Sequence, residues 1–441
     1  MLLDRRTIRE ERRKKSSPEI KSKRILKNRR NSSGIVTFSE MLPRMKKEND
    51  YDSAAINKRI KWLQAKTGTE LRHINHFPEH PTKLVQNIEN LIGTTAVPLG
   101  IAGPILVQGQ YAQGLFYVPI ATTQGTMLES YHRGALLANE AGGVSVVIHK
   151  DELHLDPIFI FKNINESMRF IGWVKEYDSY IKDKAKETTK HGCLIRITPF
   201  PIGNRVVLNF AYSTGDAMGL NMINIATDHA CRWIVDQIKP ESYFLRSNFS
   251  SDKKPSFYNF MMGYGKEVTA EIVLPRGIIK RYMRVSPEDI YSFWYSALLS
   301  GMQAGMIGIN AHFANGMAGI FIATGQDVAQ VVNGSLGMLT FEFTPERDLK
   351  VTTKFPQLLV GTVGGGTSLG PQSEALKLMG CHGPGRAKKF AEIVAAILLA
   401  GEISICGALA SGEFGDGDIA LRERSAVINE ISSKQPLKLE G

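Results

Sequence analysis

Hydrophobic residues at helical spacing mark the longest predicted element, near the end of the chain. Over residues 386–411, apolar side chains recur three and four positions apart, at Phe390, Ile393, Val394, Ile397, Leu398, Ile403 and Ile405. The most apolar stretch, 393–410, is interrupted by Gly401, Glu402 and Gly407. We therefore expect a buried core helix, and no transmembrane segment.

The middle of the chain follows a different pattern. Residues 158–240 predict a helix over 166–186, two strands over 193–199 and 205–213, and a second helix over 219–238. A strand hairpin flanked by helices is typical of a small α+β domain.

The remaining segments are shorter and richer in turns. An amphipathic helix is predicted within 51–75, glycine- and proline-rich turns over 84–108, a helix over 125–141, and largely helical structure over 286–324. We expect a basic, disordered N-terminal tail (1–50), a discontinuous large domain (51–157 and 241–412), a small domain (158–240) and a mobile C-terminal tail (413–441).

Charge changes the picture only at the N-terminus. The net charge of the chain is +11, but residues 1–30 hold thirteen Lys or Arg and four Asp or Glu, so the rest is close to neutral. No aromatic residue interleaves with these charges, as stacking on nucleobases would require. We favour a solvated leader, with contact to an acidic partner or anionic lipid as the alternative, and expect no specific nucleic-acid binding.

Four scattered cysteines without C-x-x-C spacing predict neither a zinc site nor a disulfide framework, and suit a reducing cytoplasm. We therefore expect a cytoplasmic protein without a metal.

Several short motifs carry candidate chemistry. They are Glu89–Gly93 with Pro98–Pro104, Ala121–Gly125, Asp216–Met222, Asp252–Pro255, Gly325–Asp327 and Gly361–Thr367. The bare backbone of Gly361–Thr367 could approach a phosphate. Asp216 is placed to cap a following helix whose first amides suit an anion.

Two charged residues complete this set. Lysines such as Lys253 and Lys254 usually lie in solvent, but a positioned cation here could stabilise an oxyanion. Asp327 follows an apolar stretch and needs a partner, which a lysine could supply.

In this order, over residues 84–413, the motifs resemble those of the 3-hydroxy-3-methylglutaryl-coenzyme A (HMG-CoA) reductase family, in forms closest to its eukaryotic and archaeal branch. The resemblance implies an α+β fold: a large domain around a long central helix, with an inserted small ferredoxin-like domain that binds NADP. It also implies a homodimer with active sites at the dimer interface, and leaves a higher oligomer open.

The family reduces a thioester to an alcohol with two NADPH, through a hemithioacetal and an aldehyde. The resemblance makes Lys253 the residue that stabilises the oxyanion, with Asp327 tuning its charge. Arg169 would hold the 2′-phosphate, which favours NADP over NAD. The other implied cofactor contacts are Asp216, Met218, Gly219, Leu220, Asn221, Val363 and Gly364. The implied substrate contacts are Ser130, Arg133, Asp252, Lys254, His312 and Asn315.

The chain also departs from the family pattern. Gln124 stands where the family has its catalytic glutamate, and an amide neither gives nor takes a proton. Asp418 occupies the position of the histidine that protonates the departing thiolate. Leu155 lies where an arginine grips the substrate carboxylate, Tyr295 replaces a lysine, and Arg246 replaces a serine.

These departures affect proton delivery and substrate recognition, whereas the dinucleotide residues are kept. Our first hypothesis is an NADP(H)-dependent oxidoreductase acting on another acyl-CoA, a carrier-bound thioester or another small carbonyl compound. The second is the family's own activity with substitute acids such as Asp418 or Glu413. Glu129 is a poor substitute, because five residues of helix would turn it about 140° away from Gln124. The third is a non-catalytic binding or scaffold protein.

Overall fold

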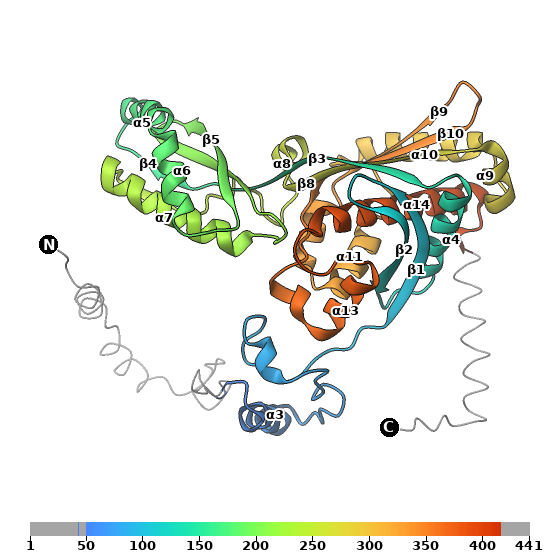
Figure 1. The fold of residues 1–441 in the computed structure, drawn as a ribbon, viewed down its shortest axis with the longest axis horizontal. Helices are drawn as coiled ribbons and strands as arrows, with labels where there is room; N and C mark the ends of the chain where they lie inside the picture. The colour runs from blue at the N-terminus through green and yellow to red at the C-terminus, as the bar shows by residue number, and fades with distance from the viewer. Residues whose placement is uncertain (1–42, 44–49, 416–441) are drawn as a thin grey trace, which may run out of the picture. The chain divides into compact units, whose positions relative to one another are not determined.

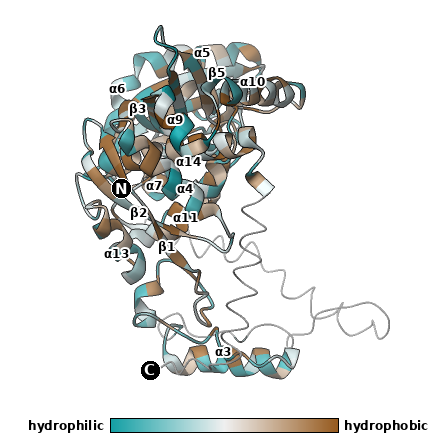
Figure 2. Cartoon of the chain, turned by 90° about the vertical axis from the view of Figure 1, so that its right-hand side faces the viewer, coloured by the Kyte–Doolittle hydropathy of each residue, from teal (hydrophilic) through white to brown (hydrophobic). Residues whose placement is uncertain are grey.

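The computed structural model describes residue 43 and residues 50–415, which form two compact units. In the first, helix α3 (Ser53–Thr67) ends at Gly68 in the left-handed conformation, φ 69°. The helix carries hydrophilic and hydrophobic residues along its length (Figure 2). Its buried Arg59 pairs with Asp50 and donates Nε to the carbonyl of Leu91 at 2.8 Å. The predicted helix within 51–75 is thus confirmed, in a shorter form.

The second unit contains a ten-stranded sheet, counted over the described residues (Figure 1). Its strands are β1 (Leu99–Gln108), β2 (Gln113–Ala121), β3 (Val144–Leu155), β4 (Ile158–Ile160), β5 (Cys193–Ile202), β6 (Arg205–Ser213), β7 (Ser242–Phe244), β8 (Gly265–Leu274), β9 (Met338–Phe343) and β10 (Leu349–Leu358). The main path runs β7-β4-β6-β3-β8-β10-β9; β1 pairs with β2 and β3, and β5 pairs with β6.

Strand β3 joins two parts of this sheet. Its residues 145–152 pair with β8, and its last three residues, 153–155, pair with β6. The larger hydrophobic core lies on the β8 side, and a second core lies on the β6 side. Residues at the end of β3 are therefore fixed in place by the smaller core.

Helix α14 (Ala387–Ser411) runs through the larger core. It packs against α4 (Met127–Glu140), α10 (Pro287–Gln303) and α11 (Phe313–Thr324). It is the one helix of the described chain that is long and apolar enough to cross a membrane, and 78% of its most apolar stretch is buried within the protein. The prediction of a buried helix over 386–411 is confirmed.

The smaller core is covered by three helices, α5 (Ile164–Glu176), α6 (Asp178–Lys186) and α7 (Leu220–Ile238), which lie beside β4, β5 and β6 (Figure 1). The predicted strands are confirmed, the first extending to Ile202. The prediction of one continuous helix over 166–186 is wrong. The chain forms two helices there, because Tyr177, with ψ of 18°, ends α5 before α6 begins.

The other elements are η3 (Pro81–Leu84), α8 (Phe257–Met262), α9 (Arg276–Met283), η4 (Val328–Gln330), α12 (Val331–Gly334), η5 (Gly365–Ser368) and α13 (Gly370–Leu378). The turns predicted over 84–108 in fact give way to β1 from Leu99 onward. Helix α4 begins at Met127 rather than at Gly125, so Gln124 lies outside it.

The α+β fold class is confirmed. The predicted domain limits stay predictions, and the tails lie almost wholly outside the described residues.

Candidate functional site

The predicted partnership between Lys253 and Asp327 exists in the structure. Lys253 Nζ lies 2.6 Å from Asp327 Oδ2, and the side chains are 37% and 31% exposed. The other oxygen of Asp327 accepts the amide of Ala329 at 3.1 Å and caps η4. The carboxylate is thereby fixed, and the ammonium it holds remains open to a ligand.

Lys253 lies on a strained loop. Asn248, Ser251 and Lys253 all have positive φ, at 70°, 49° and 58°. Such backbone costs about 1–3 kcal/mol per residue and persists only where surrounding contacts impose it. Here buried Asn259 donates to the carbonyl of Ser250 at 2.6 Å, and buried Asn333 donates to that of Ser251 at 3.2 Å.

The neighbouring Asp252 is also held in place. Gln330 donates to its Oδ1 at 2.7 Å, and Lys254 Nζ donates to its backbone carbonyl at 3.2 Å. Burial, together with the charge of Asp252, raises the pKa of Tyr264 well above its usual value. Tyr264 therefore stays a neutral phenol beside this loop.

Gly361–Thr367 lies beside two of the other motifs. Gln326 donates to the carbonyl of Gly361 and accepts its amide, at 2.9 and 2.8 Å. The amide of Thr362 donates to the carbonyl of Asp216 at 2.8 Å. A Cβ on Gly361 would lie 2.6 Å from the nitrogen of Met218, so only glycine permits this approach. The structure thus brings together three segments that the sequence places far apart.

The predicted capping role of Asp216 is wrong. Helix α7 begins at Leu220, and its N-cap is Gly219 with φ 85°. The Asp216 carboxylate instead accepts the amides of Gly385 and Ala387, at 2.7 and 3.0 Å. It therefore binds the backbone at the start of α14, where the amide of Ala387, the first helical residue, has no partner within the helix.

Arg169 lies on α5, in the smaller-core part of the second unit. It lines a cavity of about 440 Å³ together with Lys162, Lys239, Trp173 and one carboxylate, Glu166. Three cationic side chains around one depression suit a phosphate group.

Gln124 lines a larger cavity, of about 550 Å³. Its Oε1 accepts a hydrogen bond from Asn315 Nδ2 at 3.1 Å. Glu129 and Glu413 line the same cavity. The geometric argument against Glu129 fails, because it assumed a helix that begins near Gly125, whereas α4 begins at Met127. Asp418 lies outside the described residues.

Ser130 and Arg133 line this cavity from α4. Arg133 donates to Oγ and the backbone carbonyl of Ser404, at 3.0 and 3.1 Å, and Ser130 bonds the same hydroxyl at 3.1 Å.

His312 also borders this cavity and is 7% exposed. The carboxylate of Glu402, which is fully buried on α14, accepts the amides of Ala311 and His312 at 2.6 and 2.7 Å and lies 3.0 Å from His312 Nδ1. The imidazole stacks on Tyr131, with ring centroids 4.9 Å apart. The motifs did not predict a role for Glu402. The available signal was a carboxylate within an apolar helix, which must find partners.

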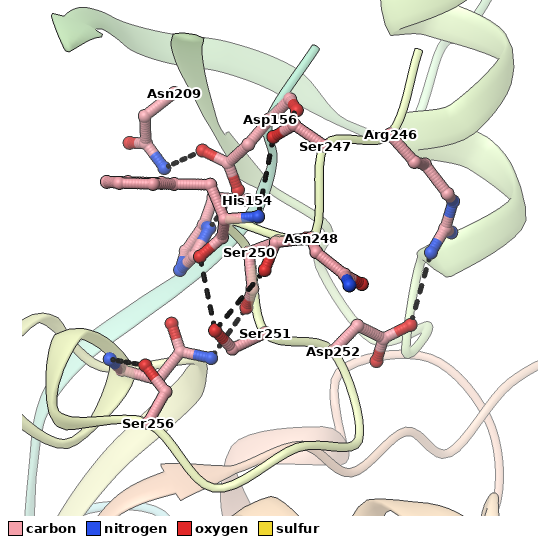
Figure 3. Close-up of polar contacts among 12 residues, drawn as sticks. His154, Asp156, Asn209, Arg246, Ser247, Asn248, Ser250, Ser251, Asp252 and Ser256 are labelled. Atoms are coloured by element: carbon pink, nitrogen blue, oxygen red, sulfur yellow. Dashed lines mark hydrogen bonds and ion pairs between the residues drawn. The ribbon is translucent and has the colours of Figure 1, made fainter. Parts of the chain in front are cut away.

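Arg246 extends toward Asp252 (Figure 3). Its two terminal nitrogens donate to Asp252 at 3.3 Å and to Asn224 at 2.9 Å, and the side chain is 44% exposed. The next residue, Ser247, donates its amide and hydroxyl to the carbonyl of Asp156, at 3.1 and 2.6 Å. Arg246 is thereby close to the end of β3, where Leu155 is buried in the smaller core.

Apart from Arg169, which lines a separate cavity, the predicted site residues that the structure describes form two clusters at opposite ends of α11. His312 and Asn315 lie at its start, and Asp327 follows its end at Gly325. Twelve helical residues span about 18 Å. Neither Lys253 nor Asp327 lines the cavity of Gln124. We call the groups around Lys253 and around Gln124 the lysine cluster and the glutamine cluster. Among residues 43 and 50–415, no group of His, Cys, Asp and Glu could hold a metal ion.

This fold agrees with the comparisons to known proteins. The family model described as hydroxymethylglutaryl-coenzyme A reductase matches residues 55–422. The chain is 43% identical over 362 residues to the 3-hydroxy-3-methylglutaryl-coenzyme A reductase of Pyrococcus abyssi, covering 80% of this chain and 89% of the relative. It is 39% identical over 370 residues to that of Methanocaldococcus jannaschii, covering 81% and 90%. The chain belongs to the HMG-CoA reductase family.

The fold has a counterpart among solved structures. The class II HMG-CoA reductase of Streptococcus pneumoniae, solved with NADPH in open conformations, superimposes with a TM-score of 0.60. It shares 19% identity and covers 80% of this chain and 96% of its own.

Proposed function

We propose that this protein is an NADPH-dependent reductase that converts HMG-CoA to mevalonate. The observation that carries this proposal is the ion pair of Lys253 and Asp327, next to the loop of Gly361–Thr367. Relatives with about two fifths of their residues in common are named for that activity. Because of these relatives, we prefer this function to our first hypothesis of a different carbonyl substrate.

The residues fit the dinucleotide. Gly364 and Gly365 have φ of 75° and 55°, and no atom lies within 4 Å of where a Cβ would stand, so their backbone is open to a ligand. The cavity around Arg169 supplies cations for a phosphate. NADPH would be held by these residues and, when bound, would supply the hydride.

Lys253 would act on the substrate oxygen. As the thioester carbonyl and later the aldehyde become tetrahedral, negative charge collects on that oxygen. A fixed ammonium nearby stabilises this charge more in the transition state than in the ground state. Asp327 holds Lys253 in position, so little reorganisation is needed when the charge appears.

Recognition of the substrate carboxylate would rest on Arg246. A guanidinium can bind a carboxylate through two parallel hydrogen bonds. Arg246 is half-exposed and lies on the same loop as Lys253 and Lys254, beside the end of β3. Arg246 would then supply, from the adjacent segment, the cation that the resemblance expects at Leu155. This arrangement favours a thioester with a terminal carboxylate.

The two clusters would meet in a homodimer. In one chain they lie at opposite ends of α11, too far apart to act on one carbonyl carbon. A second copy related by two-fold symmetry can bring the lysine cluster of one protomer to the glutamine cluster of its partner.

The direct test is mevalonate formation from HMG-CoA and NADPH at high enzyme concentration, with Lys253→Met as the inactive control. We expect slow turnover, because Gln124 cannot relay a proton. NADPH binding without any mevalonate would contradict the proposal.

One observation favours a second candidate. Leu155 is buried where the resemblance expects an arginine, and an apolar residue there favours an acyl thioester without a terminal carboxylate. A panel of neutral acyl-CoA thioesters, run beside HMG-CoA, distinguishes the two. A preference for the neutral thioesters would support the second candidate.

A further inference from the structure

We propose that His312, oriented by Glu402, is the acid that protonates the departing coenzyme A thiolate in this protein. The inference rests on the proposed thioester reduction, and concerns one step of it. It gives a role to a buried imidazole in a chain whose acidic residue at position 124 has become an amide.

Glu402 fixes the imidazole from one side. Its carboxylate is fully buried and accepts two backbone amides as well as contacting His312 Nδ1. A carboxylate beside Nδ1 accepts a hydrogen bond from the Nδ1–H group, so Nε2 is the ring nitrogen that exchanges a proton with a ligand. Stacking on Tyr131 then sets the plane of the ring.

The other ring nitrogen of His312 points to a missing ligand. His312 Nε2 is buried and finds no hydrogen-bond partner among the residues that the structure describes. A buried polar atom without a partner is unfavourable, so its retention calls for an explanation. His312 lines the 550 Å³ cavity together with Ser130 and Arg133. A sulfur atom in that cavity would give Nε2 the partner it lacks.

The other charged and titratable groups around the cavity are less suited to this step. They are Tyr131, Glu129 and Arg133 on α4, Glu402 on α14, and Glu413 beyond it. Burial and the charge of Glu402 raise the pKa of Tyr131 well above its usual value, so this phenol holds its proton tightly. Arg133 stays protonated at any ordinary pH. Glu129 and Glu413 remain as competitors and enter the test.

The proposed step balances. The hemithioacetal oxyanion re-forms its carbonyl, the carbon–sulfur bond breaks, and the electron pair of that bond leaves with sulfur. The thiolate then takes the Nε2 proton of the imidazolium, giving the free thiol, the aldehyde and a neutral imidazole. Glu402 is the counter-ion of the imidazolium beforehand, and solvent restores the proton afterwards. No electrons are exchanged with another molecule in this step.

Comparing the two reduction steps, of the thioester and of the aldehyde, distinguishes a thiolate-protonating acid from a residue with another role. Thioester reduction releases a thiolate, whereas reduction of the corresponding free aldehyde does not. General acid catalysis contributes typically about 10²–10⁴-fold. We expect His312→Gln to slow thiol release from HMG-CoA by about a hundredfold or more, and to leave aldehyde reduction within about threefold of wild type. His149→Gln, an exposed histidine on β3, is the matched control.

Glu402→Gln tests the orienting role. We expect a smaller selective loss of the thioester step, with an altered dependence of that step on pH, because the amide no longer pairs with the imidazolium. If His312→Gln fails to fold, this variant carries the test by the same comparison of the two steps.

Several outcomes would overturn the inference. They are equal loss of both steps in His312→Gln, or a selective loss of the thioester step in Glu129→Gln or Glu413→Gln instead. The proposed function fails separately, if wild-type protein reduces neither the thioester nor the aldehyde with NADPH.

Discussion

At the scale of single residues, position 124 limits the proposed chemistry. Gln124 keeps a hydrogen bond with Asn315 but cannot move a proton. We expect Gln124→Glu to raise the rate of HMG-CoA reduction by about a hundredfold, the low end of what a positioned acid or base contributes. Steady-state kinetics measure this. Gln124→Ala is the control and should bring no gain. An unchanged rate in Gln124→Glu would mean that the rest of the site works without a relay at this position.

Substitution of Arg246 tests how the substrate carboxylate is bound, rather than the chemical steps. A charge-assisted hydrogen bond contributes about 1.5–3 kcal/mol, or roughly ten- to hundredfold in affinity. We expect Arg246→Gln to lower kcat/KM for HMG-CoA by that factor, mainly through KM. The same thioester with a neutral terminal amide should be unaffected. Arg246→Lys should retain part of the preference. An equal loss with both substrates would show that Arg246 only holds Asp252 in place.

At the scale of elements, the contact between α4 and α14 depends on glycine. A Cβ on Gly134 would lie 1.9 Å from the carbonyl oxygen of Ala400, which belongs to the buried helix and cannot retreat. Overpacking of this kind costs about 1–3 kcal/mol. We expect Gly134→Ala to lower the free energy of unfolding by that amount in urea titrations. In α5, Gly172 has open space around its Cβ position. Gly172→Ala should therefore raise stability by up to about 1 kcal/mol. Matching effects of the two variants would refute this account.

The junction of α9 and α10 should respond to acid. Arg276 donates both terminal nitrogens to Glu288, at 2.6 and 3.0 Å, and lowers the pKa of Glu288 from 4.5 to about 2. Because the unfolded chain binds this proton more tightly, the pair stabilises the fold above about pH 4.5 and loses its effect as pH falls toward 2. Urea midpoints of wild type and Glu288→Gln should differ at pH 6 and converge near pH 2. The difference should be small, since the pair is exposed. A constant difference would contradict the assignment.

Helices and strands could be predicted where a local pattern of apolar residues defines them. The helix over 387–411 follows from apolar spacing alone, and the β5–β6 hairpin follows from its two apolar runs. Hydrogen bonds between residues far apart in the sequence could not be predicted. Asp216 was expected to cap the next helix, yet its partners are Gly385 and Ala387, about 170 residues away. Glu402 could be read only as a polar interruption, because the backbone it supports precedes it by 90 residues.

At the scale of the whole molecule, the motifs of the candidate site could be recognised from the sequence, but their division between two places could not. His312, Asn315 and Asp327 lie within sixteen residues of one another in the sequence. In the structure, α11 separates the first two from the third, so the Gln124–Asn315 contact and the Lys253–Asp327 pair belong to different clusters. A sequence does not show which way a helix points within an assembly.

This division leads to a prediction about the dimer. If each active site combines the lysine cluster of one protomer with the glutamine cluster of its partner, two inactive variants should complement one another. Lys253→Met disables the first cluster, and Asn315→Leu blocks the second. A heterodimer of the two, isolated with two different affinity tags, would contain one intact site and one doubly defective site. We expect it to show about half of the wild-type activity, while each homodimer is inactive. If both clusters instead served one site within a single chain, every site in the heterodimer would carry a defect. The heterodimer would then be as inactive as either parent.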